Sequence, residues 1–264
     1  MMESAITQDL YWTESGAGEP VFLLHGGFLD HRMWDGQVPA LAADHRVIAP
    51  DARGHGRSAN ASGPFRHVDD VAALACRLGT GPAVFVGVSM GASTAVDLAL
   101  EYPELVKAVV VSGAGTSEPA FADPWTLGVL GRWHAAMSVG DLDGSVEAFL
   151  SFAAGPHRRL DALDPAVVGR LRTMALGTMS KHTPGEPDYL RPVHDTWTRV
   201  AGIAVPVLAL SGALDSPDHL AMSDRLIAAV PDGRSHPIPD AAHYPNLEHP
   251  ALFTDLLRAY LASL

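Results

Sequence analysis

The chain has 264 residues, of which 47% are hydrophobic and 18% charged, and its formal net charge at pH 7 is −12. This composition indicates a globular chain with a well-buried core and argues against intrinsic disorder. The negative charge argues against a nucleic-acid partner, because phosphate binding needs a basic surface.

The first residues carry no basic start followed by an apolar stretch, so they do not resemble a signal peptide. No apolar run approaches the roughly 20 residues that span a bilayer, so we expect a cytoplasmic protein without membrane contact. Residues 6–13 predict an antiparallel edge strand or hairpin. Short apolar runs then alternate with helical patterns, as is typical of strands that crossover helices bury on both faces. Strands are expected at 21–24, 46–49, 83–86, 106–111 and 206–210, and helices at 33–43, 68–78, 89–101, 221–230 and 247–261.

This alternation predicts an α/β fold with a mostly parallel, doubly wound sheet. The rhythm breaks after residue 111, and the segment from 117 to 200 contains no convincing strand. Short helices are expected there at 142–152 and 165–176, the second with Asp164 as its N-cap and Pro165 at its first position. We therefore predict a core formed by residues 1–116 and 201–264, with residues 117–200 forming a helical cap inserted between two core strands.

The single cysteine, Cys76, excludes an internal disulfide and a thiolate zinc site. It lies within the helical pattern 68–78, where we interpret it as a small core residue.

Ser89 stands in the motif Gly-Val-Ser-Met-Gly at residues 87–91, directly after an apolar strand pattern and directly before a helical one. A sharp turn in this context raises the serine above the edge of the sheet. Gly87 and Gly91 remove side chains where strand and helix crowd each other. This context predicts a nucleophile, against the alternative of an ordinary serine in a strand-to-helix turn.

A serine hydroxyl needs a base to become nucleophilic, and the base needs an acid to orient it. His243 is the predicted base, because it lies in a loop between a short strand-like run and the last helix. Asp215 is the predicted acid, because it follows a strand and the order Ser…Asp…His is kept. Three other carboxylates compete for this role. Asp218 is interpreted as the cap of the following helix, Asp240 as a residue that serves its own turn, and Glu248 as a support of the histidine loop.

The run Leu-His-Gly-Gly-Phe at residues 24–28 follows the first parallel strand. Such a glycine-rich turn lets a backbone N–H face a reacting carbonyl, so the N–H groups of Phe28 and Met90 are the predicted oxyanion donors. His25 is expected to hold this loop by hydrogen bonding. The charged loop at 50–58 is interpreted as structural, with Asp51 and Arg53 paired. In the inserted segment Trp125, Trp133 and Met137 are candidate substrate contacts, together with Gly27; the alternative is that the cap residues only form the cap's own core.

Together, the runs at 25–28, 51–58 and 87–91, with Asp215 and the His243 loop, resemble the α/β-hydrolase fold superfamily. The resemblance is nearest to its bacterial esterase, lactonase and 3-oxoadipate enol-lactonase-like branch, and residues 117–200 correspond to that family's variable cap or lid. Serine at position 89 departs from epoxide hydrolases and haloalkane dehalogenases, which carry aspartate there.

The expected activity is hydrolysis of a carboxylic ester or lactone through an acyl-enzyme on Ser89, with a small-molecule substrate and with no cofactor and no metal. Three alternatives stay open. The same triad can serve a C–C bond hydrolase acting on a 1,3-dicarbonyl-type compound, or a perhydrolase or acyltransferase. A non-catalytic ligand-binding protein on the same scaffold is the third, because fold does not establish function.

Overall fold

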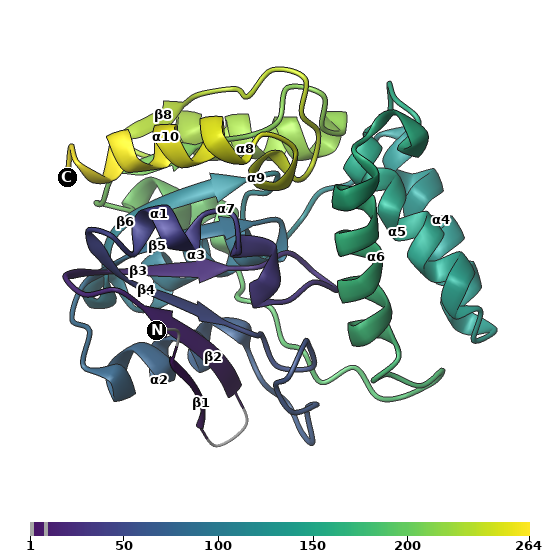
Figure 1. The fold of residues 1–264 in the computed structure, drawn as a ribbon, viewed down its shortest axis with the longest axis horizontal. Coiled ribbons are helices and arrows are strands. Elements are labelled where there is room, and N and C mark those ends of the chain that lie inside the picture. Colours follow the sequence, from purple (N-terminus) through teal and green to yellow (C-terminus); the bar gives the residue numbers. More distant parts are fainter. Residues whose placement is uncertain (1–2, 8–9) are drawn as a thin grey trace.

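The computed structural model of the protein describes residues 3–7 and 10–264, and within them a sheet of eight strands runs in the order β1-β2-β4-β3-β5-β6-β7-β8 (Figure 1). Strand β2 is antiparallel to β1 and β4, and all other neighbours are parallel. The predicted edge hairpin is confirmed by β1 and β2, although residues 8–9 between them lie outside the described residues. The strands are β1 (Glu3–Thr7), β2 (Leu10–Ser15), β3 (Glu19–Leu24), β4 (His45–Pro50), β5 (Ala83–Val88), β6 (Val106–Ser112), β7 (Val207–Ala209) and β8 (Gly233–Ser235).

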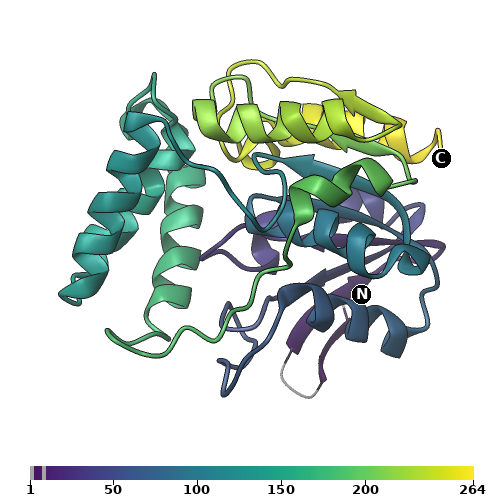
Figure 2. The same ribbon diagram turned by 180° about the vertical axis from the view of Figure 1, so that it is seen from behind.

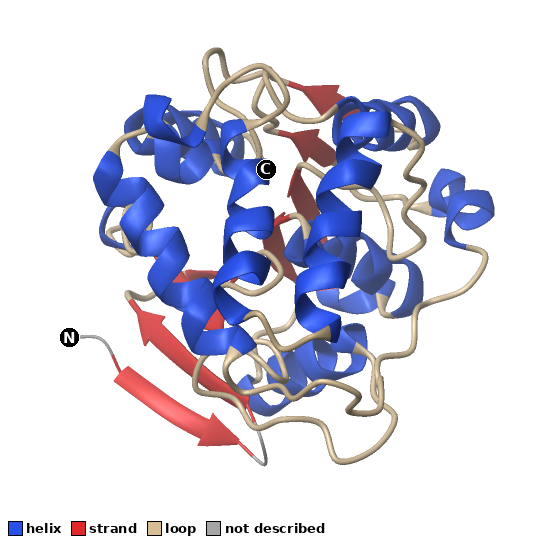
Figure 3. Ribbon diagram, turned by 90° about the vertical axis from the view of Figure 1, so that its right-hand side faces the viewer, coloured by secondary structure: helices blue, strands red, loops and turns tan. Residues whose placement is uncertain are grey.

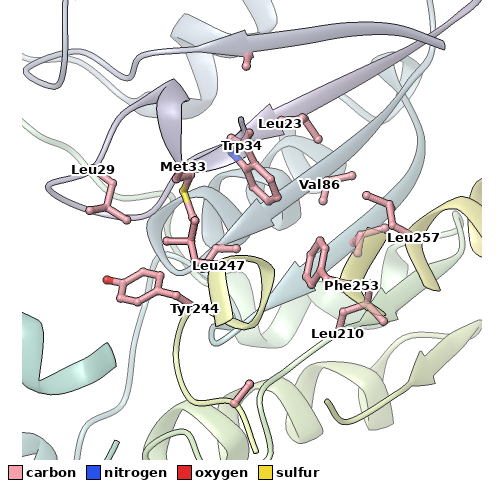
Figure 4. Close-up of a cluster of buried hydrophobic side chains, with 14 of the residues drawn as sticks. Leu23, Leu29, Met33, Trp34, Val86, Leu210, Tyr244, Leu247, Phe253 and Leu257 are labelled. Atoms are coloured by element: carbon pink, nitrogen blue, oxygen red, sulfur yellow. The ribbon is translucent and has the colours of Figure 1, made fainter. Parts of the chain in front are cut away.

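Helices cover both faces of the sheet, as continuous apolar strands require. Along β3, Val21 and Leu23 point to one face, and Phe22 and Leu24 point to the other. The first face packs on η1 (His31–Trp34), α1 (Val38–Leu41) and α10 (Pro250–Leu261), and Trp34 of η1 contacts Phe253 of α10 (Figure 4). The second face packs on α2 (His67–Leu78), α3 (Met90–Glu101) and α8 (Pro217–Ala229). The α/β fold with a mostly parallel sheet is therefore confirmed.

The helices of this core begin and end close to the predicted bounds, with two exceptions. The pattern at 33–43 divides into two short helices. The pattern at 247–261 divides before Pro250, because proline disfavours the helical conformation in the residue that precedes it. The helices that surround the sheet, including α7 at the end of the segment 117–200, are η1 (His31–Trp34), α1 (Val38–Leu41), α2 (His67–Leu78), α3 (Met90–Glu101), η2 (Pro103–Leu105), α7 (Thr196–Arg199), η4 (Val200–Gly202), α8 (Pro217–Ala229), α9 (Pro245–Glu248) and α10 (Pro250–Leu261).

Three longer helices stand between β6 and β7 in the chain and lie side by side beyond one end of the sheet (Figures 1 and 2). Helices α5 and α6 contain the two predicted ones, and Asp164 caps α6 by accepting the N–H of Ala166. Helix α4 was not predicted; Asp123 caps it at the N-terminus. These elements are α4 (Pro124–Ser138), α5 (Leu142–Ala154), η3 (Leu160–Ala162) and α6 (Pro165–Met179).

Cys76 is exposed, so its interpretation as a core residue is wrong. The buried face of α2 carries Val68, Val71, Ala72 and Ala75, and Cys76 lies at the edge of this face, one turn after Ala72. The register of the parallel strands places Leu24 beside Gly87 and Val88 beside Ser112. The turns that follow β3, β5 and β6 consequently meet at one edge of the sheet, which faces the three inserted helices (Figure 3).

Candidate active site

Ser89 lies in the turn between β5 and α3 with a backbone conformation that few residues other than glycine adopt. Its φ is 54° and its ψ is −117°, a conformation that costs about 1–3 kcal/mol and persists only where the surroundings hold it. The N–H of Ser89 donates to the carbonyl oxygen of Ser112 at 2.8 Å, and the N–H of Ser93 donates to the carbonyl oxygen of Ser89 at 3.0 Å. The sharp turn expected from the sequence is therefore present and anchored on both sides.

Asp215 and His243 form a buried pair at the same edge of the sheet. Asp215 follows β7 and precedes α8, whereas His243 lies between β8 and α9. Nδ1 of His243 lies 2.8 Å from Oδ2 of Asp215, with only 3% and 1% of the two side chains exposed. An ionised carboxylate can only accept, so Nδ1 carries the proton and Nε2 is left as the basic nitrogen.

Burial and charge set the protonation of this pair. Burial alone raises the pKa of Asp215, but the fields of His243 and His219 and the hydrogen bonds from both rings outweigh it, so the pKa of that carboxyl lies below its usual value. Burial lowers the pKa of His243 more than Asp215 raises it. At neutral pH the carboxylate is therefore ionised and the imidazole is neutral, the state that a general base requires.

The backbone after β6 connects Ser89 to His243. Ser112 accepts the N–H of Ser89, and the next residue, Gly113, has a φ of 64° and lies so close to His243 that an added Cβ would stand 2.8 Å from its ring. In the described part of the chain the Ser89 hydroxyl makes no hydrogen bond to His243. Catalytic hydrogen bonds are often longer in ligand-free structures than in complexes.

The turn after β3 carries Phe28, whose φ of 60° is again in the left-handed region. Nε2 of His25 accepts the N–H of Ala52 at 2.9 Å, so His25 fixes this turn to the loop after β4, as expected. A Cβ added to Gly27 would stand 4.0 Å from Cβ of Met90, so the turn approaches the start of α3. Met90 is the first residue of that helix, and its N–H is one of those that a helix leaves without an intrahelical partner.

A second histidine, His219, contacts the same carboxylate and was not predicted. Its Nδ1 lies 3.2 Å from Oδ1 of Asp215, and its ring stacks on His243 with 4.2 Å between ring centroids. Ser216 caps α8, which places His219 in the first turn of the helix. Because helical side chains lean toward the N-terminus, the spacing Asp-Ser-Pro-Asp-His at 215–219 was the available signal.

Comparison with known proteins places the chain among relatives with the same architecture. A family model described as alpha/beta hydrolase fold matches residues 19–250. The chain belongs to the α/β-hydrolase fold family. Pimeloyl-[acyl-carrier protein] methyl ester esterase of Pectobacterium atrosepticum is 31% identical over 95% of this chain and 98% of its own length.

Solved structures of α/β hydrolases agree in fold. A thermophilic esterase from Thermogutta terrifontis superposes with a TM-score of 0.77 at 25% identity, covering 100% of this chain and 98% of that one. The enol-lactonase from Burkholderia xenovorans has a TM-score of 0.76 at 24% identity, covering 96% of each chain. The predicted resemblance to this superfamily is thus confirmed.

In this α/β-hydrolase chain a cavity of about 680 Å³ lies between the sheet edge and the inserted helices. Gly27, Phe28 and Met90 line one side of it, and Trp133 and Met137 of α4 line another. Ser89 and His243 are not among its lining residues, although Met90, the residue after Ser89, is. Trp125 does not line this cavity either; it packs edge-on against Phe152, whose ring lies 5.7 Å from that of His243.

In the charged loop after β4, which also contributes Arg53, Gly54 and His55 to the cavity wall, the predicted pair of Asp51 and Arg53 is wrong. Asp51 accepts the ring nitrogen and the backbone N–H of His31, each at 2.7 Å. It also accepts the N–H of Arg57. Arg53 instead forms an ion pair with Asp70 at 2.7 Å. Two of the partners of this loop, His31 and Asp70, lie outside it in the sequence. The spacing of residues within the loop therefore does not reveal them.

The carboxylates that competed with Asp215 serve other contacts. Asp218 accepts the N–H groups of Ala122 and Asp123 at the start of α4, so its interpretation as the cap of α8 is wrong. Glu248 accepts the N–H of Ala242 at 2.7 Å and thereby supports the histidine loop, as expected. The carbonyl of Asp240 accepts from Arg158.

In the part of the chain that the structure describes, two groups of side chains bring metal-ligand atoms within 4.8 Å of one another: Asp215, His219 and His243, and Asp30, His31 and Asp51. Asp30 already accepts hydrogen bonds from Nε and Nη2 of Arg32. In the other group, Nδ1 of His219 and Nδ1 of His243 each lie within hydrogen-bond distance of Asp215. Among the described residues, no helix has the length and apolar character to cross a membrane.

Proposed function

We propose that this protein is a serine hydrolase that cleaves a carboxylic ester or a lactone through an acyl-enzyme on Ser89. The observation that carries the proposal is the buried Asp215–His243 pair at 2.8 Å, beside a strained serine turn that ends a central strand. The esterase relative, which matches along nearly the whole chain, supports the same reaction class.

In the proposed reaction Nε2 of His243 removes the proton of the Ser89 hydroxyl as the oxygen attacks the substrate carbonyl. The resulting imidazolium is stabilised by the ionised carboxylate of Asp215, and it returns the proton to the leaving alkoxide. Water then attacks the acyl-enzyme by the same route in reverse. The proposed oxyanion donors, Phe28 and Met90, are worth about 3–4 kcal/mol each when placed at the developing charge. These residues complete the reaction without a cofactor.

We further propose that residues 117–200 form the cap that closes over this site and selects the substrate. The support is the 680 Å³ cavity, because Trp133 and Met137 from α4 line it together with Gly27 and Phe28. The rings of Trp133 and Phe28 also contact each other, with 5.3 Å between their centroids. Aromatic and thioether side chains on its wall favour a substrate of medium size with an apolar acyl part.

Covalent labelling tests the proposal directly. A fluorophosphonate probe should react with the protein, and peptide mapping should place the label on Ser89 and not on Ser93 one turn later. A panel of p-nitrophenyl esters, lactones and 1,3-diketones should then show turnover of the esters or lactones. Labelling with turnover of the diketones alone would reassign the protein to C–C bond hydrolysis, and no labelling at all would support a binding protein.

A further inference from the structure

The carboxylate of Asp215 is shared between two imidazole rings, one on each oxygen. Oδ2 faces Nδ1 of His243 at 2.8 Å, and Oδ1 faces Nδ1 of His219 at 3.2 Å. Oδ1 also accepts the backbone N–H of Ser216 at 2.7 Å. A triad needs only the first of these contacts, so the contact with His219 requires its own explanation.

The proton positions follow from the partners. A carboxylate oxygen offers only lone pairs, and we therefore assign the proton of His219 to Nδ1, where it can point to Oδ1. The same nitrogen lies 2.8 Å from the Ser216 hydroxyl oxygen, which also accepts the backbone N–H of His219 at 3.3 Å. Ser216 thus holds the first turn of α8 so that the ring of His219 stays in line with Asp215.

The surroundings of His219 fix its ring in place. Phe121 and Phe152 contact it edge-on, with ring centroids at 5.8 and 5.5 Å, and His243 stacks on it. The side chain is only 7% exposed. The titratable groups that contact His219 are Asp215 and His243. Tyr244 contacts His243 in turn, and burial raises the pKa of Tyr244 well above its usual value, so that this side chain stays uncharged.

We propose that His219 is a positioning residue that holds the Asp215 carboxylate in the orientation that His243 needs. This inference rests on the proposed serine hydrolase function. Rotation of the carboxylate about its Cβ–Cγ bond would weaken the contact with His243; the donors on Oδ1 oppose that rotation. The donors on Oδ1 also weaken the attraction of Asp215 for the proton of His243. This effect favours the neutral imidazole, which is the form that acts as a base.

Two substitutions separate this role from simple packing. His219→Phe keeps a flat ring between Phe121 and Phe152 but removes the donor. His219→Asn keeps a donor, because its amide nitrogen is as many bonds from the backbone as Nδ1, but removes most of the ring. If positioning matters, His219→Phe lowers kcat by about 10- to 100-fold at nearly constant KM, the range seen for partners that orient a functional histidine, and His219→Asn restores most of it.

The pH dependence provides a readout that packing does not move. A donor on Oδ1 of Asp215 weakens the attraction of this carboxylate for the proton of His243. In His219→Phe, which lacks the donor, the rising limb of kcat/KM should therefore move to higher pH, whereas His219→Asn, which keeps a donor, should stay nearer the original profile. NMR of the intact protein without substrate tests the same contact: the downfield Nδ1–H signal of His243 should shift or broaden, and the ring should titrate at higher pH, in His219→Phe. Thermal unfolding of both variants confirms that they fold.

The inference is overturned if His219→Phe leaves kcat and the His243 titration unchanged, or if His219→Asn is as damaging as His219→Phe. Failure of the hydrolase proposal looks different. In that case Ser89→Ala and Asp215→Asn keep their activity, whereas the NMR shift of His243 in His219→Phe still reports the contact.

Discussion

A Cβ on Gly91 would stand 2.1 Å from the carbonyl oxygen of Leu24, at the end of the neighbouring strand β3. Gly87 is equally confined, since its Cβ would stand 2.2 Å from the carbonyl carbon of Gly91. Strand β5, helix α3 and the end of β3 therefore meet backbone to backbone. The Ser89 turn is possible only because two side chains are missing beside it.

Gly91→Ala should lower the free energy of unfolding by roughly 1–3 kcal/mol, as overpacking of a rigid contact does. Urea unfolding measures the loss. Gly169→Ala is the matched control, because this glycine lies within α6 with no atom within 4 Å of an added Cβ. It should gain up to about 1 kcal/mol, since alanine favours a helix over glycine. Equal stability of the wild-type protein and Gly91→Ala would contradict the close packing described here.

Ser89→Ala should abolish fluorophosphonate labelling and reduce turnover on the order of 10³- to 10⁶-fold. The fold should survive, because only one hydroxyl is removed from a half-buried turn. Steady-state kinetics and mass spectrometry measure the two effects. Ser93→Ala, whose hydroxyl bonds only the carbonyl of Ser89 at 3.3 Å, is the control and should stay close to wild type. Near-normal activity of Ser89→Ala would exclude it as the nucleophile.

Asp215→Asn should reduce kcat by up to about 10⁴-fold, because an amide cannot stabilise the same tautomer and charge of His243. Asp240→Asn and Glu248→Gln are the comparison variants, measured on the same ester. A larger loss in either of them than in Asp215→Asn would move the role of the acid to that residue.

The pH profile of kcat/KM should have a rising limb below the ordinary histidine pKa of 6.5, because burial lowers the pKa of His243. Only the neutral imidazole accepts the serine proton, so activity is low below the folded-state pKa and complete above it. Stability has the same sign: a buried neutral histidine stabilises the fold above pH 6.5 and loses this contribution as pH falls through that value. A limb midpoint above 6.5 would argue that another group controls the rate.

Trp133→Ala should change the relative kcat/KM for short and long acyl chains, because Trp133 lines the 680 Å³ cavity. Each methylene that a pocket recognises is worth about 1–3 kcal/mol of discrimination. Trp125→Ala is the matched comparison, since Trp125 packs on Phe152 outside that cavity wall. It should lose thermal stability with little change in selectivity. The opposite pattern would place the substrate on the Trp125 side of the inserted helices.

Much of this fold could be predicted because its strands are buried on both faces, so that runs such as those in β3, β5 and β6 are continuously apolar. Ser89 could be found because its motif stands between such a strand and a helix. The division of the last helical pattern at Pro250 could have been anticipated from the proline rule. Helix α4 could also have been anticipated, because Asp123 and Pro124 begin it with the same cap and proline that Asp164 and Pro165 supply to α6.

Contacts between distant segments were the limit. The partners of Asp51, Arg53 and Asp218 lie on elements that come together only in the folded chain. His219 escaped notice for a related reason: its contact with Asp215 depends on where the cap at Ser216 starts helix α8. The spacing of Asp215 and His219 is compatible with a contact between them, but it does not show where the helix begins or which way the ring of His219 points.

The carboxylate of Asp218 has a mechanical consequence. It accepts hydrogen bonds from the N–H groups of Ala122 and Asp123, which directly precede α4. Asp218 itself lies in the first turn of α8, beside His219 and shortly after Asp215. Helix α4, which carries Trp133, is therefore hydrogen-bonded at its start to the segment that follows Asp215. One side chain thus joins the start of the helix that lines the cavity to the segment that carries the acid.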